Sequence, residues 1–458
     1  MTEPDPAGRV EWSLVTQLLR ATQTALSAQL QRRPELPPDA VRALGQQLIV
    51  DEVNRLAVER LHAGELPLSA SAESYLADAV FAGLFEMGRL QPLLDDTEIE
   101  DIMIDGCDQV FLSYAGGKVV PHPPVADSDE ELIELLRFIA ARLGRSERML
   151  TTAHPHLNMR LPDGSRLAAM IETVPRVAVV IRRHRVRDLD LDDLISWGGV
   201  DEVLAQFLRA AVRARKNIVV TGTWGAGKTS LLRALAAEIP AAERFGTIET
   251  EYELLLHELP ERHPRVVAFE AREGSGERTA AGRQLGEVTL TDLVEQAHRM
   301  TLRRLMIGEV RGAEIGPMLE VMQASEGGSM CTLHARSARG AIGRMVTLLM
   351  RTMANSSEDL AYRTISESVD LIVHLRMVDT GWIDGDGGAG RQRFVSEVIE
   401  INGPGEPGRP PTVTDIFLPR SDGRAVPVGR PEDLADYINV GFDPGWFDER
   451  GGRWEQQR

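Results

Sequence analysis

The feature that most constrains this chain is a glycine-rich segment between an apolar run and a helical pattern. The run Ile218, Val219, Val220 predicts a strand, and the helical pattern begins at Lys228. The residues that join them follow G-x-x-x-x-G-K-T, a pattern typical of a loop that binds nucleotide phosphates. The segment consists of Gly222, Thr223, Trp224, Gly225, Ala226, Gly227, Lys228 and Thr229, followed by Ser230.

The chemistry of a nucleotide accounts for each part of this loop. Glycines let the loop turn its backbone N–H groups toward the phosphates, and the helix N-terminus adds partial positive charge. We expect Lys228 to reach the β- and γ-phosphates and Thr229 to ligate Mg²⁺. Lys118, Lys216 and Lys228 are the only lysines among 51 basic residues, so the loop uses lysine where the chain otherwise prefers arginine. The segment predicts ATP and Mg²⁺ as ligands.

The surroundings of the loop predict an α/β fold. A helix near 200–213, a strand over 217–221 and a helix from 228 alternate along the chain. Alternation of this kind implies a parallel sheet with crossover helices.

Four parts are expected along the 458 residues. The first stretch is helical by period, with Leu14, Leu18, Ala21, Ala25 and Ala28 on one predicted buried face. The acidic segment 188–193 predicts a linker, and frequent glycine and proline in 381–390 and 403–411 predict a small appendage. The parts are a helical N-terminal subdomain over 1–90, an α+β (PAS-like) N-terminal domain over 91–187, a P-loop domain over 188–378 and a C-terminal appendage over 379–458.

Charge and cysteine content exclude several classes of protein. With 51 basic and 69 acidic residues the net charge is −18, which opposes attraction to a phosphate backbone, so no stable nucleic-acid partner is expected. Cys107 and Cys331 are the only cysteines, too few for a disulfide framework or a four-cysteine zinc site, and they fit a reducing cytoplasm. The first ten residues lack the pattern of a signal peptide, and no apolar run approaches the ~20 residues of a membrane span. Any membrane association is therefore expected to be peripheral.

A nucleotide-hydrolysing site also needs carboxylates. Leu305, Met306 and Ile307 form an apolar run that leads through Gly308 to Glu309, which is the form of a Walker B strand. Glu309 is then placed to polarise the attacking water. An apolar strand that ends in glutamate is common, so this motif gains weight only from the P-loop.

Four ordered stretches resemble the GspE/VirB secretion ATPase superfamily, and among its branches the CpaF/TadA type. The similarity extends from about residue 93 to about residue 417. The branches for type II export and pilus extension usually carry a four-cysteine motif, which this chain lacks. The stretches are Leu161, Pro162, Asp163, Gly164, Ser165, Arg166; the P-loop; Ile307, Gly308, Glu309, Val310, Arg311, Gly312; and Thr332, Leu333, His334, Ala335.

The resemblance implies a RecA-like ATPase domain and roles for the matching residues. Glu309 is the implied general base. Glu249 and Glu253 lie in the family's Asp box and are candidates for the metal and water environment, with Glu249 and Thr229 as candidate metal ligands. This chain has Thr250 where that box usually has aspartate. His334 matches the second histidine of the His box, which is thought to sense the γ-phosphate, while Glu326 replaces the first.

The resemblance also implies arginines from the preceding domain that approach the nucleotide. A guanidinium there would neutralise charge that develops on the transferred phosphoryl group and make hydrolysis depend on domain closure. The matching residues are Arg160, Arg166, Arg182 and Arg183.

The function implied is an ATP-hydrolysing motor that powers pilus assembly or protein export. It would form a ring, as a homo-oligomer and specifically a hexamer, in the cytoplasm against the inner face of the cell membrane, and would bind platform proteins there. Two alternatives stay open. One is a DNA-translocating or helicase-type P-loop motor. The other is a nucleotide-gated scaffold that does not hydrolyse ATP, an alternative raised by Thr250 and Glu326.

Overall fold

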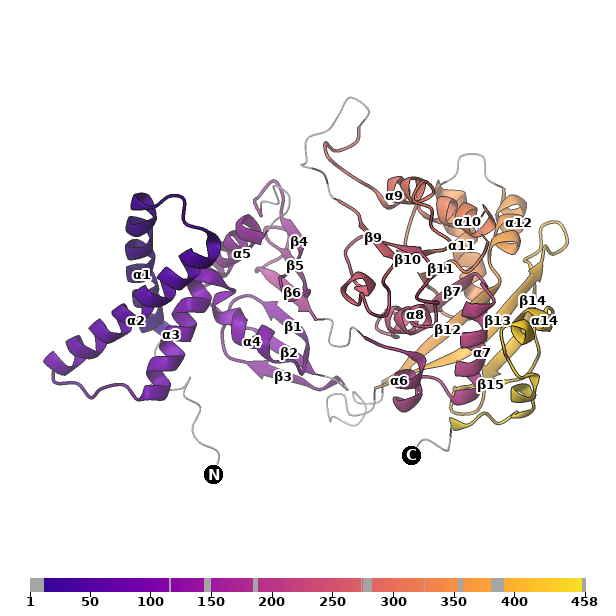
Figure 1. Cartoon of the computed structure of the whole chain (residues 1–458), viewed down its shortest axis with the longest axis horizontal. Helices are drawn as coiled ribbons and strands as arrows, with labels where there is room; N and C mark the ends of the chain where they lie inside the picture. The colour runs from indigo at the N-terminus through magenta and orange to yellow at the C-terminus, as the bar shows by residue number, and fades with distance from the viewer. Residues whose placement is uncertain are drawn as a thin grey trace. The chain divides into compact units, whose positions relative to one another are not determined.

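The computed structural model describes two compact units, unit 1 up to residue 185 and unit 2 from residue 186, with residues 116–118 grouped with unit 2 (Figure 1). The residues described are 12–114, 117–143, 150–183, 188–272, 274, 282–324, 326–352, 357–379 and 391–454. The N-terminal ten residues and the glycine-rich stretch 381–390, used above, lie outside them.

Unit 1 combines a three-helix bundle with an antiparallel sheet. The sheet has the strand order β3-β2-β1-β6-β5-β4, and its buried residues pack with α4 and α5 into one core. The elements are α1 (Trp12–Arg32), α2 (Pro38–His62), α3 (Ala70–Phe85), the 3₁₀ helix η2 (Gly88–Leu90), α4 (Gln91–Asp95), β1 (Ile99–Asp105), β2 (Val110–Tyr114), β3 (Val119–His122), α5 (Asp129–Leu143), β4 (His156–Arg160), β5 (Arg166–Met170) and β6 (Ala178–Arg182).

The buried face of α1 differs from the predicted one. Helix α1 buries Val15, Leu18, Thr22 and Leu26, so of the predicted stripe only Leu18 lies in the buried set. Thr22 can occupy the interior because its hydroxyl donates to the carbonyl of Leu18 at 2.7 Å, which satisfies the polar group within the helix. The prediction was wrong because the alanines fit the helical period equally well, whereas the larger Val15 and Leu26 bury more apolar surface.

Unit 2 is built on a nine-stranded sheet with the order β15-β14-β13-β12-β7-β11-β10-β8-β9. Strands β12 to β9 in this order are parallel, and β13, β14 and β15 continue the sheet in antiparallel pairs. The elements are α6 (Leu191–Ser196), α7 (Glu202–Arg213), β7 (Ile218–Gly222), α8 (Lys228–Ala236), β8 (Phe245–Glu249), η4 (Leu256–Glu258), β9 (Val266–Glu270), α9 (Leu290–Ala297), β10 (Leu305–Val310), α10 (Ile315–Ala324), β11 (Met330–His334), α11 (Ala338–Thr352), α12 (Glu358–Ser368), β12 (Leu371–Val378), β13 (Gln392–Gly403), β14 (Thr412–Pro419), β15 (Ala425–Pro427), α14 (Leu434–Asn439) and η5 (Pro444–Asp448).

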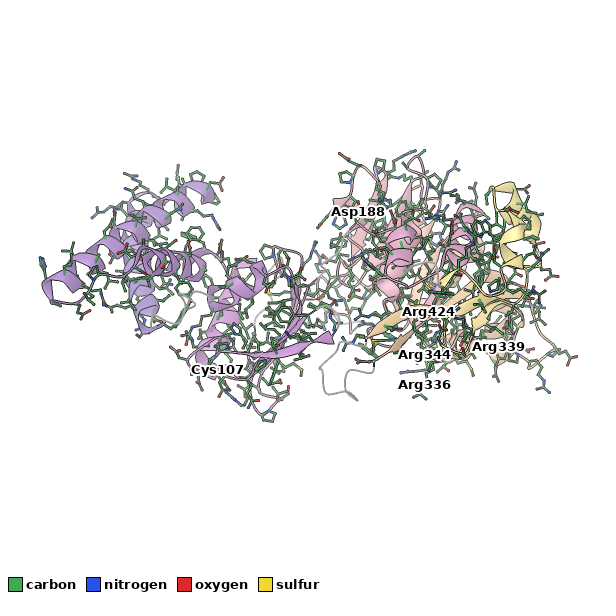
Figure 2. All side chains as sticks on the ribbon, turned by 90° about the horizontal axis from the view of Figure 1, so that it is seen from below. Cys107, Asp188, Arg336, Arg339, Arg344 and Arg424 are labelled. Atoms are coloured by element: carbon green, nitrogen blue, oxygen red, sulfur yellow. The ribbon has the colours of Figure 1, made fainter. Side chains whose placement is uncertain are left out.

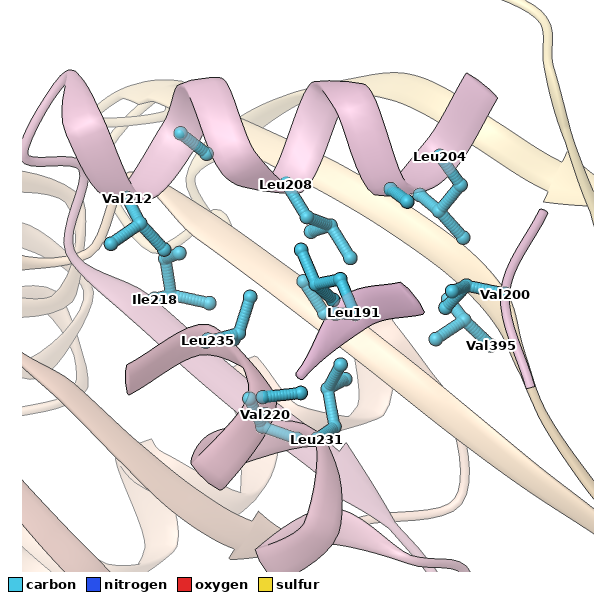
Figure 3. Packing of buried hydrophobic residues seen from close by; sticks show 14 of the residues in the cluster. Leu191, Val200, Leu204, Leu208, Val212, Ile218, Val220, Leu231, Leu235 and Val395 are labelled. Carbon is cyan, nitrogen blue, oxygen red and sulfur yellow. The ribbon is translucent and has the colours of Figure 1, made fainter. Parts of the chain in front are cut away.

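Helices cover both faces of this sheet, which makes the predicted α/β fold correct. One core contains residues of α6, α7 and α8, and Figure 3 shows side chains of α7 and α8 directed at Ile218 and Val220 of β7. A second core on the opposite face contains residues of α9 to α12 together with Val219 and Ile307. The parallel strands are buried on both faces, which explains why β7 reads as a continuous apolar run.

The structure contradicts the predicted C-terminal end of the P-loop domain and shifts the predicted linker at its start. The segment 379–458 is not a separate appendage, because β13 to β15 belong to the same sheet and Tyr437 and Phe447 pack on Phe207 of α7. The acidic segment 188–193 was predicted as a linker, and the boundary between the units does lie just before it, after residue 185, but most of the segment belongs to the start of α6. Asp190 caps α6 by accepting from the backbone N–H of Asp193, so this carboxylate is there to satisfy a helix terminus.

Both cysteines are free thiols buried in the two units. Cys107 lies in unit 1 (Figure 2), and Cys331 lies in β11 of unit 2. Burial raises the pKa of the Cys331 thiol, so it is protonated and behaves as a small apolar side chain. Among the residues that the structure describes, no helix is long and apolar enough to cross a membrane.

Candidate nucleotide site

The candidate site lies where four neighbouring parallel strands end. Gly222 ends β7, Glu249 ends β8, Glu309 is the penultimate residue of β10, and His334 ends β11. Carboxyl ends of parallel strands meet at one edge of a sheet, and ligands of open α/β sheets bind at that edge. Residues that are up to 112 positions apart, as are Gly222 and His334, are thereby brought together, and these two are direct partners in the register of β7 and β11.

The loop from Gly222 to Gly227 has the backbone that a phosphate cradle requires. Gly225 and Gly227 have φ of +71° and +91°, a region that residues with a Cβ rarely adopt. Gly222 packs so closely that a Cβ there would lie 2.8 Å from the carbonyl oxygen of Leu375. Gly227 precedes α8 and provides no side-chain cap, so the first N–H groups of this nine-residue helix remain available to an anion.

Lys228, His334 and Glu309 form a chain of contacts beside the loop. The Nζ atom of Lys228 donates to the carbonyl of Thr223 at 3.1 Å and lies 3.2 Å from Nδ1 of His334. The same Nζ atom lies 3.5 Å from Nε2, and Nε2 lies 3.0 Å from Oε1 of Glu309. Oε1 of Glu309 is buried and accepts no hydrogen bond from the described residues, so the approach of Nε2 to Oε1 is a close contact without the geometry of a hydrogen bond.

The protonation states in the site follow from burial and from neighbouring charge. Burial lowers the pKa of Lys228 to about 8, opposed by the Glu309 carboxylate. Burial, together with the charge of Lys228, also lowers the pKa of His334, so its imidazole is neutral at pH 7. Burial raises the pKa of Glu309, but the hydrogen bond and charge of Arg311 outweigh that effect and hold the pKa below its usual value. Glu309 is therefore ionised and able to accept a proton.

An irregularity in β10 directs Glu309. The register between β10 and β11 shifts between Ile307 and Val310, so β10 carries an extra residue there. The hydroxyl of Thr332 donates to the carbonyl of Gly308 at 2.6 Å and holds this part of the strand. Arg311, which directly follows β10, pairs with Oε2 of Glu309, whereas Oε1 lies 3.0 Å from Nε2 of His334 and accepts no hydrogen bond from the described residues.

The turn after β8 brings two of the predicted carboxylates to the loop. Glu249 is buried, and its Oε1 accepts from the backbone N–H groups of Glu253 and Leu254 at 2.9 and 2.8 Å. Glu253 in turn accepts from the hydroxyl of Thr229 at 3.3 Å, and its carbonyl accepts from Arg233 of α8. Glu249 therefore organises the turn that presents Glu253 to Thr229, a role that the sequence did not indicate.

The donor set around Thr229 fits a magnesium ion held largely by its substrate. No three acidic, histidine or cysteine side chains in the described part of the chain are grouped so that they could hold a metal by themselves. Mg²⁺ commonly takes one or two protein oxygens and completes its shell with phosphate oxygens and water. The hydroxyl of Thr229 and the carboxylate of Glu253 are suitable oxygens of this kind.

Comparison with known proteins decides the family. The family model described as "Type II/IV secretion system protein" matches residues 85 to 384, more than half of the chain. The chain belongs to this family. Among curated relatives, it is 28% identical to the type IV secretion system protein VirB11 of Brucella suis, over 69% of this chain and 89% of that one. It is 27% identical to the conjugal transfer protein TrbB of Rhizobium radiobacter, over 68% and 86%.

Solved structures similar to the chain include those of two ATPases. The VirB11 ATPase of the Brucella suis type IV secretion system is 26% identical, with 70% of this chain and 95% of that chain covered and a TM-score of 0.34. The ATPase DotB of Legionella pneumophila is 19% identical, with 69% and 80% covered and a TM-score of 0.47.

Glu326 and Thr250, the two residues at which this chain differs from the motifs of the secretion ATPases that it resembles, both lie in unit 2. Glu326 precedes β11 and lies 3.8 Å from Arg303 and 3.9 Å from Arg215 in ion pairs. It stands before the amino end of the strand whose carboxyl end carries His334, and five residues of strand span ~16 Å. Glu326, at the position where the motif usually has histidine, is thus remote from His334. Thr250 follows directly after β8 and is exposed.

The four predicted arginines lie in unit 1, and three of them occupy facing positions in its sheet. Arg160, Arg166 and Arg182 occupy one row across β4, β5 and β6, since Arg160 faces Arg166 and Arg166 faces Arg182. Arg182 also pairs with Asp101 at 2.8 Å. Arg183 differs: its guanidinium donates to the carbonyl of Asp96 within unit 1 and is mostly buried.

Two residues make contacts at the phosphate loop that the sequence did not predict. Arg393 of β13 donates to the carbonyl of Gly225 at 2.8 Å, although it lies within the segment predicted to be an appendage. No local signal could reveal a contact across 168 residues. Trp224 was predicted as part of the phosphate loop, but its ring stacks on His334 with centroids 4.6 Å apart. Only the folded chain brings those rings together.

Proposed function

We propose that this chain is an ATP-hydrolysing motor that powers pilus assembly or protein export through a membrane platform. The observation that carries the proposal is the chain of contacts Lys228, His334, Glu309 beside an open glycine loop. A triphosphate in that loop would place its γ-phosphate between an ammonium and an ionised carboxylate. Those are the two charges that phosphoryl transfer to water requires at that position.

The residues divide the reaction among themselves. Backbone N–H groups of the loop and of the α8 N-terminus would bind the phosphates, and Lys228 would exchange Thr223 and His334 for the β- and γ-oxygens. Glu309 would orient water and accept its proton as the bond to the ADP oxygen breaks. Mg²⁺, held in part by Thr229, would neutralise phosphate charge. His334, which already contacts Lys228 and Glu309, would register whether a γ-phosphate is present.

The arginine row supports a second part of the proposal, in which unit 1 closes on the nucleotide of its own or a neighbouring chain. The three arginines gather positive charge on facing strand positions, and Asp101 pairs with Arg182. Guanidinium groups arranged in this way would attract the phosphates of a nucleotide. ATP binding would then favour the closed state, because Arg160, Arg166 and Arg182 would contact the nucleotide only in that state and so raise its affinity for ATP.

The remaining features of the proposal follow from the family and the branch that the sequence resembles. We place the protein in the cytoplasm at the inner face of the cell membrane, as a hexameric ring of the CpaF/TadA type on platform proteins. The net charge of −18 favours a protein platform over nucleic acid as its partner.

Two substitutions test the site. Lys228→Ala and Glu309→Gln are each expected to lower ATP turnover at least ~100-fold, because one removes phosphate charge stabilisation and the other removes the base. Lys118→Ala and Glu320→Gln, at exposed positions, are the matched controls and should keep full turnover. Turnover is measured as released phosphate, with thermal melting to verify folding.

Three results would point elsewhere. Wild-type turnover in either variant would refute its assigned role. Tight ATP binding without turnover in the wild-type ring would favour a nucleotide-gated scaffold. Strong DNA binding that weakens with salt would favour a DNA-translocating motor instead.

A further inference from the structure

Trp224 is the one aromatic residue of the phosphate loop, and it is unusually exposed. The residue is 74% exposed, although an indole generally gains by burial. Its ring stacks on that of His334, with centroids 4.6 Å apart and planes inclined by 23°. The loop holds the indole there, since Arg393 fixes the carbonyl of the next residue, Gly225, at 2.8 Å.

His334 needs a fixed ring orientation to serve both of its partners. The Nζ atom of Lys228 lies 3.2 Å from Nδ1 and 3.5 Å from Nε2, and Oε1 of Glu309 lies 3.0 Å from Nε2. Rotation about the Cβ–Cγ bond would move Nε2 away from Glu309. Once a nucleotide draws Lys228 toward the phosphates, the contact with Lys228 is lost, and the approach to Glu309 and the stacked indole are the restraints that remain on the imidazole.

We propose that Trp224 is a positioning residue that holds the imidazole of His334 in register with Glu309 during turnover. This inference rests on the proposed ATPase function and deepens it. The indole supplies a flat apolar face inclined by 23° to the imidazole, which restrains the plane of the ring while Nε2 keeps its approach to Glu309. A small residue at position 224 would leave the loop intact but the imidazole free to rotate.

Steady-state kinetics of four variants test the proposal. Trp224→Ala is expected to lower kcat about 2- to 10-fold with KM for ATP unchanged, the size of effect that a lost aromatic stack produces. Trp224→Phe, which retains a stacking face, should recover most of the loss. In a His334→Gln background Trp224→Ala should cost nothing further, because its effect passes through the imidazole.

Each contrary outcome has a distinct meaning. An equal loss from Trp224→Ala with and without His334 overturns the proposal and assigns Trp224 to another partner. A higher KM with unchanged kcat also overturns it, because Trp224 then contacts the nucleotide itself. If Trp224→Ala turns over ATP like the wild type, the inference fails while the ATPase function stands. If the wild type shows no turnover, the proposed function fails and the inference with it.

Discussion

Replacement of Gly308 by alanine is expected to lower both stability and ATP turnover, because the added methyl group would press on the buried side chain of Glu249. Gly308 precedes the proposed base in β10, and a Cβ added there would lie 3.0 Å from Cγ and 3.1 Å from Oε1 of Glu249. Carbon atoms in ordinary contact are ~3.5–4.0 Å apart. The methyl group must therefore displace Glu249, a buried side chain that holds the turn to Glu253 and Leu254.

The magnitude follows from these contacts. Overpacking of this kind costs about 1–3 kcal/mol of the free energy of unfolding. Glu253, which contacts Thr229, would move with the turn, so ATP turnover should fall at least ~10-fold even though every proposed catalytic side chain is retained.

Gly343→Ala is the matched control. Gly343 lies on the exposed side of α11, and a Cβ there meets no atom within 4 Å. Since alanine favours a helix over glycine, this change should raise the free energy of unfolding by up to ~1 kcal/mol and leave turnover unchanged. Urea denaturation followed by circular dichroism, together with phosphate release, measures both variants. Gly308→Ala with wild-type stability and turnover would refute the proposed link from Gly308 through Glu249 to the site.

Two further predictions concern pH. Arg311→Gln removes the main group that holds the pKa of Glu309 low against burial, so the acid limb of the plot of kcat against pH should shift to higher pH. Arg363→Gln, on the exposed side of α12, is the control and should not shift it. An unchanged acid limb in Arg311→Gln would show that Arg311 does not set the pKa of Glu309. Phosphates would raise the pKa of Lys228 from about 8, so binding takes up a proton above that pH and ATP affinity should fall by up to about tenfold per pH unit. Calorimetric titrations from pH 7 to 9.5 measure this, and constant affinity above pH 8 would contradict it.

What the sequence by itself determined is local in the chain. The loop from Gly222 to Thr229 is contiguous, and its strand, turn and helix are neighbours, so its glycine conformations could be anticipated from residue type. The alternation of strands and helices likewise predicted the parallel sheet, since crossover connections allow few arrangements.

Only the tertiary structure decided which distant residues meet. The register of β7 and β11 pairs Gly222 with His334, and the antiparallel return of β13 brings Arg393 to the loop. Apolar residues after β12 could be buried against any apolar surface, because hydrophobic burial has no preferred direction. The sequence therefore did not show that β13, β14 and β15 join the sheet and share its core. The physical reason is that long-range contacts depend on strand order and register, which are properties of the whole sheet and leave no mark on any single segment.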